Sequence, residues 1–597
     1  MGHPVTYRVS MPNPHSHLFE VEADFPATSL SDLSVCLPVW TPGSYLVREY
    51  ARHVQDFEVT DLAGTRLPFT RVDKRSYRIV SQGAPVRCRY RVYANELTVR
   101  TSHLDGTHGY FNGATLFFYS EQLRLGPHRV RIEAPSSWHV TTTLRRDHLG
   151  YLAADYDELV DSPFELGPTP PIEFIAGGKA HELALWGDLQ LDEKRLVGDL
   201  TRIIEAEAAL FDGVPNDRYV FFLYGTDKGR GGLEHKASTA LLYPRTALST
   251  PRGWEDFLTL CAHEYLHLWN VKRIKPKRFV PFDYAQENYT QLLWFFEGGT
   301  SYYDSLITHR AGCLSTSRYL SRLGETVTSV LATPGRKSMS LAEASMVAWI
   351  KHYRPDENTA NTAISYYAKG ELVCALLDLT IRKATSSRRS LDDVLRLLWR
   401  RYGDESGAPE NGVEAAAAEV AGVDLGPFFE RALRSTDELD LSIFETVGLE
   451  AKTRTRESPV DKGGTPPRRA ERKDEGWLGV TARGNAIATV VVGSPAMEAG
   501  LYADDEVCAL DHLKCDAATL VARCEERKPG EVVTVTLFRR ERLLEVPVTL
   551  GPKPLDTCWL ARVDRPTESQ RAAYEAWLKT SWDEVEPKGL GLLETRL

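Results

Sequence analysis

The segment His263-Glu264-Tyr265-Leu266-His267 holds two imidazoles four positions apart with a carboxylate between them. On a helix, side chains four positions apart lie on one face about one turn apart, so both imidazoles can reach the same metal ion. Glu264 then lies beside the ion rather than on it, where it can act as general base toward a water molecule. The spacing therefore predicts a zinc site that activates water for hydrolysis. Two helix histidines that bind no metal are the alternative.

A third protein ligand is expected, because hydrolytic zinc sites use three such ligands and leave the fourth position for water. Glu297 is the candidate: it follows the apolar run Leu292-Leu-Trp-Phe-Phe296 and precedes two glycines. A carboxylate in so apolar a run is costly to bury unless a positive partner compensates it. We therefore predict one Zn²⁺ per chain. Its predicted ligands are His263, His267 and Glu297.

Two further segments carry residue types that suit the same chemistry. Gly231-Gly232-Leu-Glu234 follows strand-like residues. A glycine-rich edge strand with a carboxylate can bind a peptide backbone and a free amine, although a hairpin turn explains the segment equally well. Tyr367 opens a helical stretch. A phenol near the metal could donate to a developing oxyanion, and a tyrosine buried in the core is the alternative.

The composition limits the partners of the chain. Its 597 residues include 42% hydrophobic and 26% charged residues, and the net charge is −10. An acidic chain is a poor ligand for nucleic acid, because a phosphate backbone requires a basic face. No apolar run reaches the roughly 20 residues of a membrane span, so we expect a soluble protein. Nine cysteines without paired spacing, and no visible secretory signal, favour a reducing, cytoplasmic setting.

The elements that must position these residues change character along the chain. Residues 1–171 alternate apolar and polar side chains, as in Val86–Tyr93, which predicts an antiparallel β-sandwich. Residues 172–454 begin with strands such as Tyr219–Tyr224 and pass into helical periodicity from Trp254 onward. Strands followed by helices predict an α+β domain, and every candidate residue of the metal site belongs to it.

Three more segments follow. Residues 455–475 are charged and rich in Pro and Gly, which predicts a flexible linker. Residues 476–555 have the length of a small compact domain. Residues 556–597 form a tail in which the capping-box pattern Thr567-Glu-Ser-Gln570 after Pro566 predicts a helix. The chain is therefore expected to be multidomain.

Taken together, these motifs resemble the glycyl aminopeptidase family of zinc metallopeptidases. The resemblance implies an N-terminal β-sandwich, a thermolysin-like α+β catalytic domain over 172–454 and a C-terminal PDZ domain over 476–555. It extends over nearly the whole chain. The stretches that carry it are Trp40–Arg52, Thr101–Asp105, His108–Gly113, Gly231–His235, His263–Pro276 and Glu297–Ser301.

The resemblance also assigns roles to individual residues. Glu234, with Gly231 and Gly232, takes the amine-binding place of the exopeptidase motif in the broader HExxH aminopeptidases, although His235 replaces the asparagine of that motif. Tyr367, in Tyr367-Ala-Lys-Gly370, aligns with their catalytic tyrosine. The spacer between the second histidine and the glutamate ligand is longer than in those relatives, which implies a different cleft wall.

The segment 476–555 resembles a bacterial-type PDZ domain through Gly476-Trp-Leu-Gly-Val480 and Ser494–Leu501. The resemblance implies a loop whose backbone amides receive a peptide carboxylate, made of Trp477, Leu478, Gly479 and Val480. Asp504 and Asp511-His512 stand where glycine turns are usual, and Asp tolerates the left-handed conformation better than most residues. We further hypothesise that the C-terminal residues 590–597 occupy this groove, with a frayed terminus as the alternative.

Three functions are compatible with these residues. The resemblance implies a zinc aminopeptidase that removes small N-terminal residues, Gly or Ala, from peptides. The alternatives are a zinc endopeptidase whose substrates are directed by the PDZ domain, and a non-catalytic PDZ adaptor on a peptidase scaffold. The intact ligands, base and tyrosine argue against the adaptor. The expected partners are peptide substrates and a C-terminal peptide ligand of the PDZ domain, with no nucleic acid and no membrane span.

Overall fold

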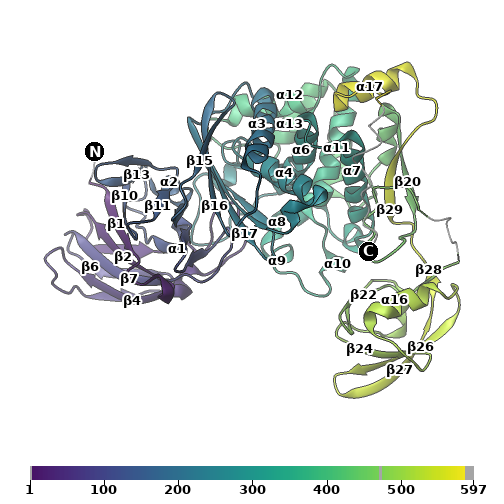
Figure 1. Cartoon of the computed structure of the whole chain (residues 1–597), viewed down its shortest axis with the longest axis horizontal. Helices are drawn as coiled ribbons and strands as arrows, with labels where there is room; N and C mark the ends of the chain where they lie inside the picture. The colour runs from purple at the N-terminus through teal and green to yellow at the C-terminus, as the bar shows by residue number, and fades with distance from the viewer. Residues whose placement is uncertain (1–2, 469–473, 585–597) are drawn as a thin grey trace. The chain divides into compact units, whose positions relative to one another are not determined.

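The computed structural model of the chain describes residues 3–468 and 474–584. The chain divides into two compact units, and Figure 1 labels many of their helices and strands. The first unit comprises Met1–Tyr289 and Trp399–Pro409, and the second comprises Thr290–Leu398 and Glu410–Leu597. Among the described residues, no helix has both the length and the apolar content that crossing a bilayer requires. All nine cysteines lie within the described residues and are free thiols.

The N-terminal domain is β-rich, as the alternating pattern predicts. Its largest sheet has the strand order β12 (Arg145–Asp147), β13 (Gly150–Ala153), β10 (His128–Glu133), β1 (Val5–Ser10), β2 (Leu18–Phe25), β7 (Val86–Tyr93) and β4 (Val54–Thr60). Two smaller sheets have the orders β3 (Asp32–Cys36), β6 (Ser76–Val80), β5 (Phe69–Arg71) and β11 (His139–Thr141), β14 (Phe164–Gly167), β9 (Gly109–Phe111), β8 (Ser102–Leu104).

The three sheets share one hydrophobic core. Tyr7 of β1, Ile79 of β6 and Phe111 of β9 belong to the same buried cluster. Along β7 every second side chain from Val86 to Val92 is buried, which is the pattern of a strand with one face on a core. The pair β1 and β10 is parallel, however, so the large sheet is mixed rather than wholly antiparallel as predicted. Alternation reports which face is buried and carries no information on strand direction.

A second sheet positions the candidate site. Its order is β15 (Ile172–Ala176), β16 (Lys179–Trp186), β17 (Arg218–Thr226), β19 (Ser238–Pro244) and β18 (Gly231–Glu234). The strands β16, β17 and β19 are parallel, and β18 runs antiparallel at one end of the sheet. The helix α3 (Glu193–Leu210) follows β16, and α4 (Pro251–Leu266) follows β19. The short glycine-rich strand therefore lies at an edge, where a substrate backbone can approach it.

The second unit is helical around α11 (Tyr366–Thr385). Its other helices include α5 (Leu293–Phe296), α6 (Gly298–Arg310), α7 (Thr316–Leu331), α8 (Leu341–Met346), α10 (Thr359–Thr362), α13 (Gly412–Ala421) and the 3-10 helix η5 (Pro334–Lys337). The helix α11 packs against α5, α6 and α7, and it runs beside α6 and α7 in Figure 1. Fourteen of its 20 residues are buried, because neighbours cover most of its circumference.

The C-terminal β-rich region has its own hydrophobic core, which includes Leu478, Ile487 and Val535. Its sheet has the order β22 (Val480–Arg483), β23 (Ala486–Val490), β24 (Glu506–Leu510), β26 (Val532–Arg539) and β27 (Arg542–Thr549), with β25 (Leu513–Lys514) paired to β24. Two helices, α15 (Pro495–Ala499) and α16 (Ala517–Glu525), complete it, and β21 (Gly476–Trp477) pairs with β28 (Gly551–Pro552).

The tail after this region differs from the sequence prediction. It begins with a strand, β29 (Thr557–Arg562), which pairs antiparallel with β20 (Leu449–Arg454) along its whole length. The helix α17 (Glu568–Leu578) comes only afterwards, and its capping box between Thr567 and Gln570 confirms the predicted start. Strand β29 was missed because its partner precedes it by a whole domain, and six residues carry too short a pattern. The residues 590–597 of the tail hypothesis lie outside the described residues.

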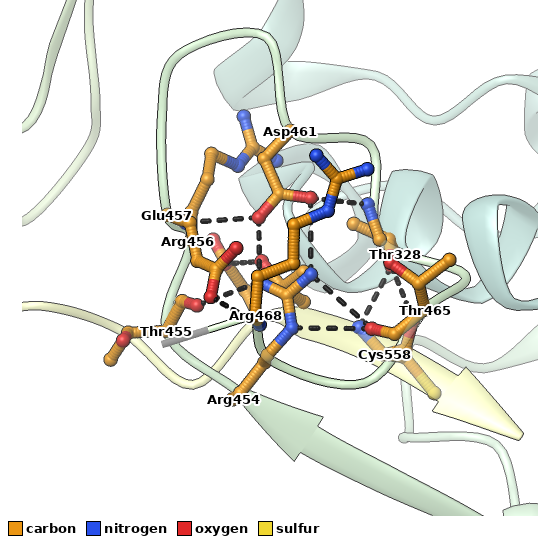
Figure 2. Close-up of polar contacts among 12 residues, drawn as sticks. Thr328, Arg454, Thr455, Arg456, Glu457, Asp461, Thr465, Arg468 and Cys558 are labelled. Carbon is orange, nitrogen blue, oxygen red and sulfur yellow. Dashed lines mark hydrogen bonds and ion pairs between the residues drawn. The ribbon is translucent and has the colours of Figure 1, made fainter. Parts of the chain in front are cut away.

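Residues 455–468, predicted as part of a flexible linker, are held around one ion pair (Figure 2). The Arg454 side chain is 2% exposed and lies 2.5 Å from the Asp461 carboxylate. Asp461 also accepts hydrogen bonds of 2.9 Å from the backbone amides of Glu457 and Gly463. Burial raises the pKa of Asp461, but these hydrogen bonds outweigh it and hold the pKa at about 2. A segment with few apolar residues is thus ordered by polar contacts, which composition does not reveal.

Candidate metal centre

The helix α4 carries the first two residues of the site. It begins at Pro251, after Thr250 accepts a hydrogen bond from the Gly253 amide as N-cap. It ends at Leu266, so His263 lies in its last turn and His267 is its C-cap. His267 keeps helical backbone angles, with φ −59° and ψ −18°. The four-residue spacing therefore places both imidazoles on one face, with 4.8 Å between ring centroids.

The structure brings the three predicted ligands together. His263, His267 and Glu297 each offer a ligand atom, and these atoms all lie within 4.8 Å of one another. Glu297 stands between α5 and α6 at the end of its apolar run and is 2% exposed. Two nitrogens and one carboxylate oxygen form the donor set that zinc prefers in hydrolytic sites. The residues present therefore fit a zinc ion.

A hydrogen bond orients one of the imidazoles. His267 is 1% exposed, and its Nδ1 lies 2.8 Å from the Asn270 carbonyl oxygen. A carbonyl only accepts, so Nδ1 carries the proton and Nε2 keeps its lone pair for a metal. Fixing the ring in this way raises the metal affinity of a histidine ligand.

The edge strand β18 packs directly on Glu264. A Cβ atom at Gly232 would lie 1.9 Å from the Glu264 Oε1, so only glycine admits this approach. Glu264 is 5% exposed, and ligand atoms of Glu234, Glu264 and His267 lie within 4.8 Å of one another. The carboxylate predicted to act as general base is thus confined between α4 and the strand.

Glu234 is a buried carboxylate with an unsatisfied oxygen. Its side chain lies at the end of β18 and is 4% exposed. Among residues 3–468 and 474–584, its Oε1 has no hydrogen-bond partner. Burying a charged oxygen without a partner is costly, so the geometry is suited to a cation that arrives from outside.

Residues of the N-terminal domain form hydrogen bonds with this strand and with His235, which follows it. The Arg100 Nη2 donates to the Gly232 carbonyl oxygen at 3.0 Å. The Asp161 carboxylate accepts from the His235 Nδ1 at 3.2 Å and from the Lys272 Nζ at 2.6 Å. Burial raises the pKa of Asp161, but Lys272 and His235 outweigh it and hold the pKa well below its usual range. Sequence reasoning missed Arg100 and Asp161, because no local spacing marks a contact made across domains.

The turn at Thr41–Ser44, also in the N-terminal domain, lies against Glu234. Gly43 has φ +90°, and a Cβ atom there would lie 2.5 Å from the Glu234 Oε1. The turn is fixed by a hydrogen bond of 3.0 Å from the Ser44 amide to the Thr41 carbonyl oxygen. Part of the motif Trp40–Arg52 therefore lies beside the candidate amine site. The sequence did not predict this position.

Tyr367 lies in the first turn of α11. Its hydroxyl is 3.3 Å from the Tyr353 hydroxyl, and its ring centroid is 5.4 Å from that of His352. Burial, followed by the nearby charge of Glu297, raises the pKa of Tyr367 well above its usual range. The phenol is protonated at neutral pH, as tyrosine ordinarily is, and can donate a hydrogen bond. Neither Tyr353 nor His352 is marked by any motif spacing.

In the C-terminal β-rich region, Trp477 ends β21, Leu478 and Gly479 connect the two strands, and Val480 begins β22. A cavity of about 760 Å³ borders Trp477, Gly479 and Val480 of this loop and the α16 residues Ala518 and Val521. Its other wall includes Leu331, Pro334 and Lys337 of the helical region. Asp504, Asp511 and His512 adopt φ values of 65°, 49° and 65°. The left-handed conformation expected where glycines are usual is therefore confirmed at all three positions.

Comparison with known proteins identifies the family of the chain. Residues 6–168 match the model of the peptidase M61 N-terminal domain, and residues 256–373 match that of the M61 glycyl aminopeptidase. The crystal structure of an aminopeptidase N family protein from Idiomarina loihiensis has a TM-score of 0.90 and 31% identity. That match covers 96% of this chain and 100% of the other.

A mutant M1 zinc metallopeptidase from Deinococcus radiodurans has a TM-score of 0.46 and 12% identity, over 74% of this chain and 95% of its own. No curated protein sequence matches the chain. The two domain matches and the identity over almost the full length confirm the resemblance that the motifs indicated. This chain belongs to the M61 glycyl aminopeptidase family and is a metallopeptidase of the aminopeptidase type.

Proposed function

We propose that this aminopeptidase binds one Zn²⁺ through His263, His267 and Glu297 and removes single residues from free peptide N-termini. The observation that carries the proposal is the convergence of the three ligand atoms within 4.8 Å. When bound, zinc lowers the pKa of a water molecule and polarises a carbonyl. By family, the preferred first residue is small, Gly or Ala.

The protein residues supply the proton transfers and the positioning. Glu264, confined between α4 and Gly232, accepts a proton from the attacking water and returns it to the leaving amine. Tyr367, whose pKa is raised, is protonated and donates a hydrogen bond to the oxyanion. The edge strand β18 aligns the substrate backbone.

Glu234 makes the enzyme an exopeptidase in this proposal. Its buried, unsatisfied oxygen receives the substrate ammonium, which closes the cleft to longer chains on that side. Replacing Glu234 with alanine is expected to raise KM and lower kcat/KM for free-amine substrates by roughly 10- to 100-fold, the effect of a charged hydrogen bond. Steady-state kinetics on matched free and N-acetylated peptides would measure this.

N-acetylated peptides serve as the internal control. They should be poor substrates of the native enzyme, and the Glu234→Ala change should leave their hydrolysis nearly unaffected. Equal cleavage of free and blocked peptides by the native enzyme would support the endopeptidase alternative instead.

The Thr41–Ser44 turn gives a second prediction about the amine site. Gly43→Ala should displace the Glu234 carboxylate, because the new Cβ atom would overlap it. We expect KM for free-amine substrates to rise about tenfold while kcat changes less, since one charged contact is worth roughly 1.5–3 kcal/mol. Michaelis–Menten kinetics on an alanyl peptide would measure the changes in KM and kcat separately.

Gly64→Ala is the matched control. Gly64 has φ +93°, close to the +90° of Gly43, but a Cβ atom there meets nothing within 4 Å. The two variants share the backbone strain of an alanine in this conformation and differ only in the contact with Glu234. If both variants show the same KM, the turn has no role in placing the carboxylate.

The C-terminal β-rich region is proposed to be a PDZ domain that binds an extended peptide end. Three observations support this: β22 lies at the end of its sheet, α16 runs beside it, and the cavity borders the Trp477–Val480 loop. A peptide would add to β22 as a further strand, with its carboxylate at the backbone amides of the loop. Residues 590–597, the proposed occupant, lie outside the described part of the chain.

A further inference from the structure

A separate cavity of about 140 Å³ lies between α7 and α11. Its wall is mostly apolar, with Val327 and Leu331 from α7 and Leu372 from α11. A cavity of roughly 150 Å³ accommodates a ligand the size of benzene. This cavity can therefore hold a small molecule with about as many non-hydrogen atoms as benzene. None of its lining residues takes part in the catalytic proposal above.

The side chain of Lys369 also lines this mostly apolar cavity. Lys369 is 2% exposed. Among the described residues, its Nζ has no hydrogen-bond or ion-pair partner. Burial lowers the pKa of Lys369, the charge of Glu438 partly opposes this, and the charge of Arg336 adds to the lowering. A buried ammonium without a partner is costly, and an incoming carboxylate would remove that cost.

The remaining charges also line the cavity. Arg336 and Glu438 lie 3.2 Å apart and neutralise each other. Asp437 is exposed and lines the same cavity, and no ion pair involves it among the described residues. Among residues 3–468 and 474–584, no group therefore forms an ion pair with the Lys369 ammonium or with the Asp437 carboxylate.

We propose that this cavity binds a free α-amino acid with a small apolar side chain. Its carboxylate meets Lys369, its ammonium meets Asp437, and its side chain packs on Val327, Leu331 and Leu372. A purely apolar ligand would leave Lys369 unpaired, and a simple anion would leave the apolar wall uncovered. A zwitterion with an apolar side chain matches both the charges and the wall.

The ligand class has a chemical relation to the enzyme. Free amino acids are what an aminopeptidase releases, and Lys369 lies two residues after Tyr367 on α11. A binding site for free amino acids on this helix would let the concentration of the released amino acid influence the helical unit that carries Tyr367. The binding itself is independent of the roles proposed for the metal ligands.

Calorimetric titration of the full-length protein with valine tests the proposal. All titrations use the Glu234→Gln chain, so that valine binding at the amine site does not contribute. We expect one valine site per chain, and at least tenfold weaker binding of isovalerate and isobutylamine, which lack the ammonium and the carboxylate respectively. Lys369→Met in this background should lower valine affinity at least tenfold.

Two further variants separate the parts of the proposal. Asp437→Asn should weaken valine and leave isovalerate unchanged, because only valine carries the ammonium. Lys337→Met is the control, since Lys337 is exposed on η5 and does not line this cavity. Lys369→Met should raise Tm, because it removes a buried unpaired charge, so lost binding would not reflect unfolding.

Three results would overturn the proposal. The first is the absence of valine binding to the Glu234→Gln chain. The second is equal valine affinity with and without Lys369. The third is isovalerate binding as tightly as valine, which would exclude a role for the ammonium. If the Lys369→Met protein does not fold, the affinities of the Asp437→Asn protein for valine and for isovalerate test the proposal instead.

Discussion

Replacing Glu264 with glutamine is expected to lower kcat by about 10²–10⁴-fold, the usual effect of losing a general base. The carboxamide cannot accept the proton of the attacking water, yet it has nearly the size of the carboxylate. Size matters here because β18 approaches so closely that a Cβ atom at Gly232 would lie 1.9 Å from Oε1. Steady-state kinetics with an alanyl substrate and metal analysis of the same sample measure both properties.

The zinc content should stay at one ion per chain in this variant, because Glu264 is proposed as base and not as ligand. Glu255→Gln is the matched control: it makes the same chemical change on α4, outside both candidate ligand groups. Loss of zinc from the Glu264→Gln protein would instead make Glu264 a ligand, together with Glu234 and His267.

Removing the metal is expected to abolish hydrolysis and to leave the fold largely intact. Small zinc domains unfold without their ion because the metal replaces a hydrophobic core. This chain has large cores that contain none of the three proposed ligands, such as the N-terminal cluster of Tyr7, Phe19 and Phe111. Dialysis against a chelator, followed by activity assays and far-ultraviolet circular dichroism, would compare the two effects.

Re-addition of zinc to the dialysed protein should restore activity in proportion to the zinc bound, up to one equivalent. His263→Ala provides the genetic counterpart, with low zinc content and no turnover. An active preparation that contains no metal would contradict the proposed chemistry altogether.

The approach of the three candidate ligands to one another could be predicted from sequence, because two local rules indicate it. Helical periodicity places His263 and His267 on one face, and the cost of burying Glu297 in an apolar run calls for a cation. Both rules use only neighbouring residues. The structure agrees, since it brings the ligand atoms of all three within 4.8 Å of one another.

The surroundings of Glu234 could not be predicted in the same way. Gly43 and Arg100 reach the strand from another domain, and their contacts depend on how sheets pack. No periodicity records such long-range contacts. The ordered segment after Arg454 was missed for a related reason, because composition counts charges but does not show which of them pair.

The β20–β29 ribbon has a consequence for how the chain is assembled. Arg454 and Thr557 are directly paired across the two strands, so everything between them enters and leaves at a single point. A tight two-residue turn is sufficient to join two such antiparallel ends. The residues between these strands therefore form an insertion with its two ends side by side. A single genetic event could add, exchange or remove this insertion without changing the order of the other strands and helices.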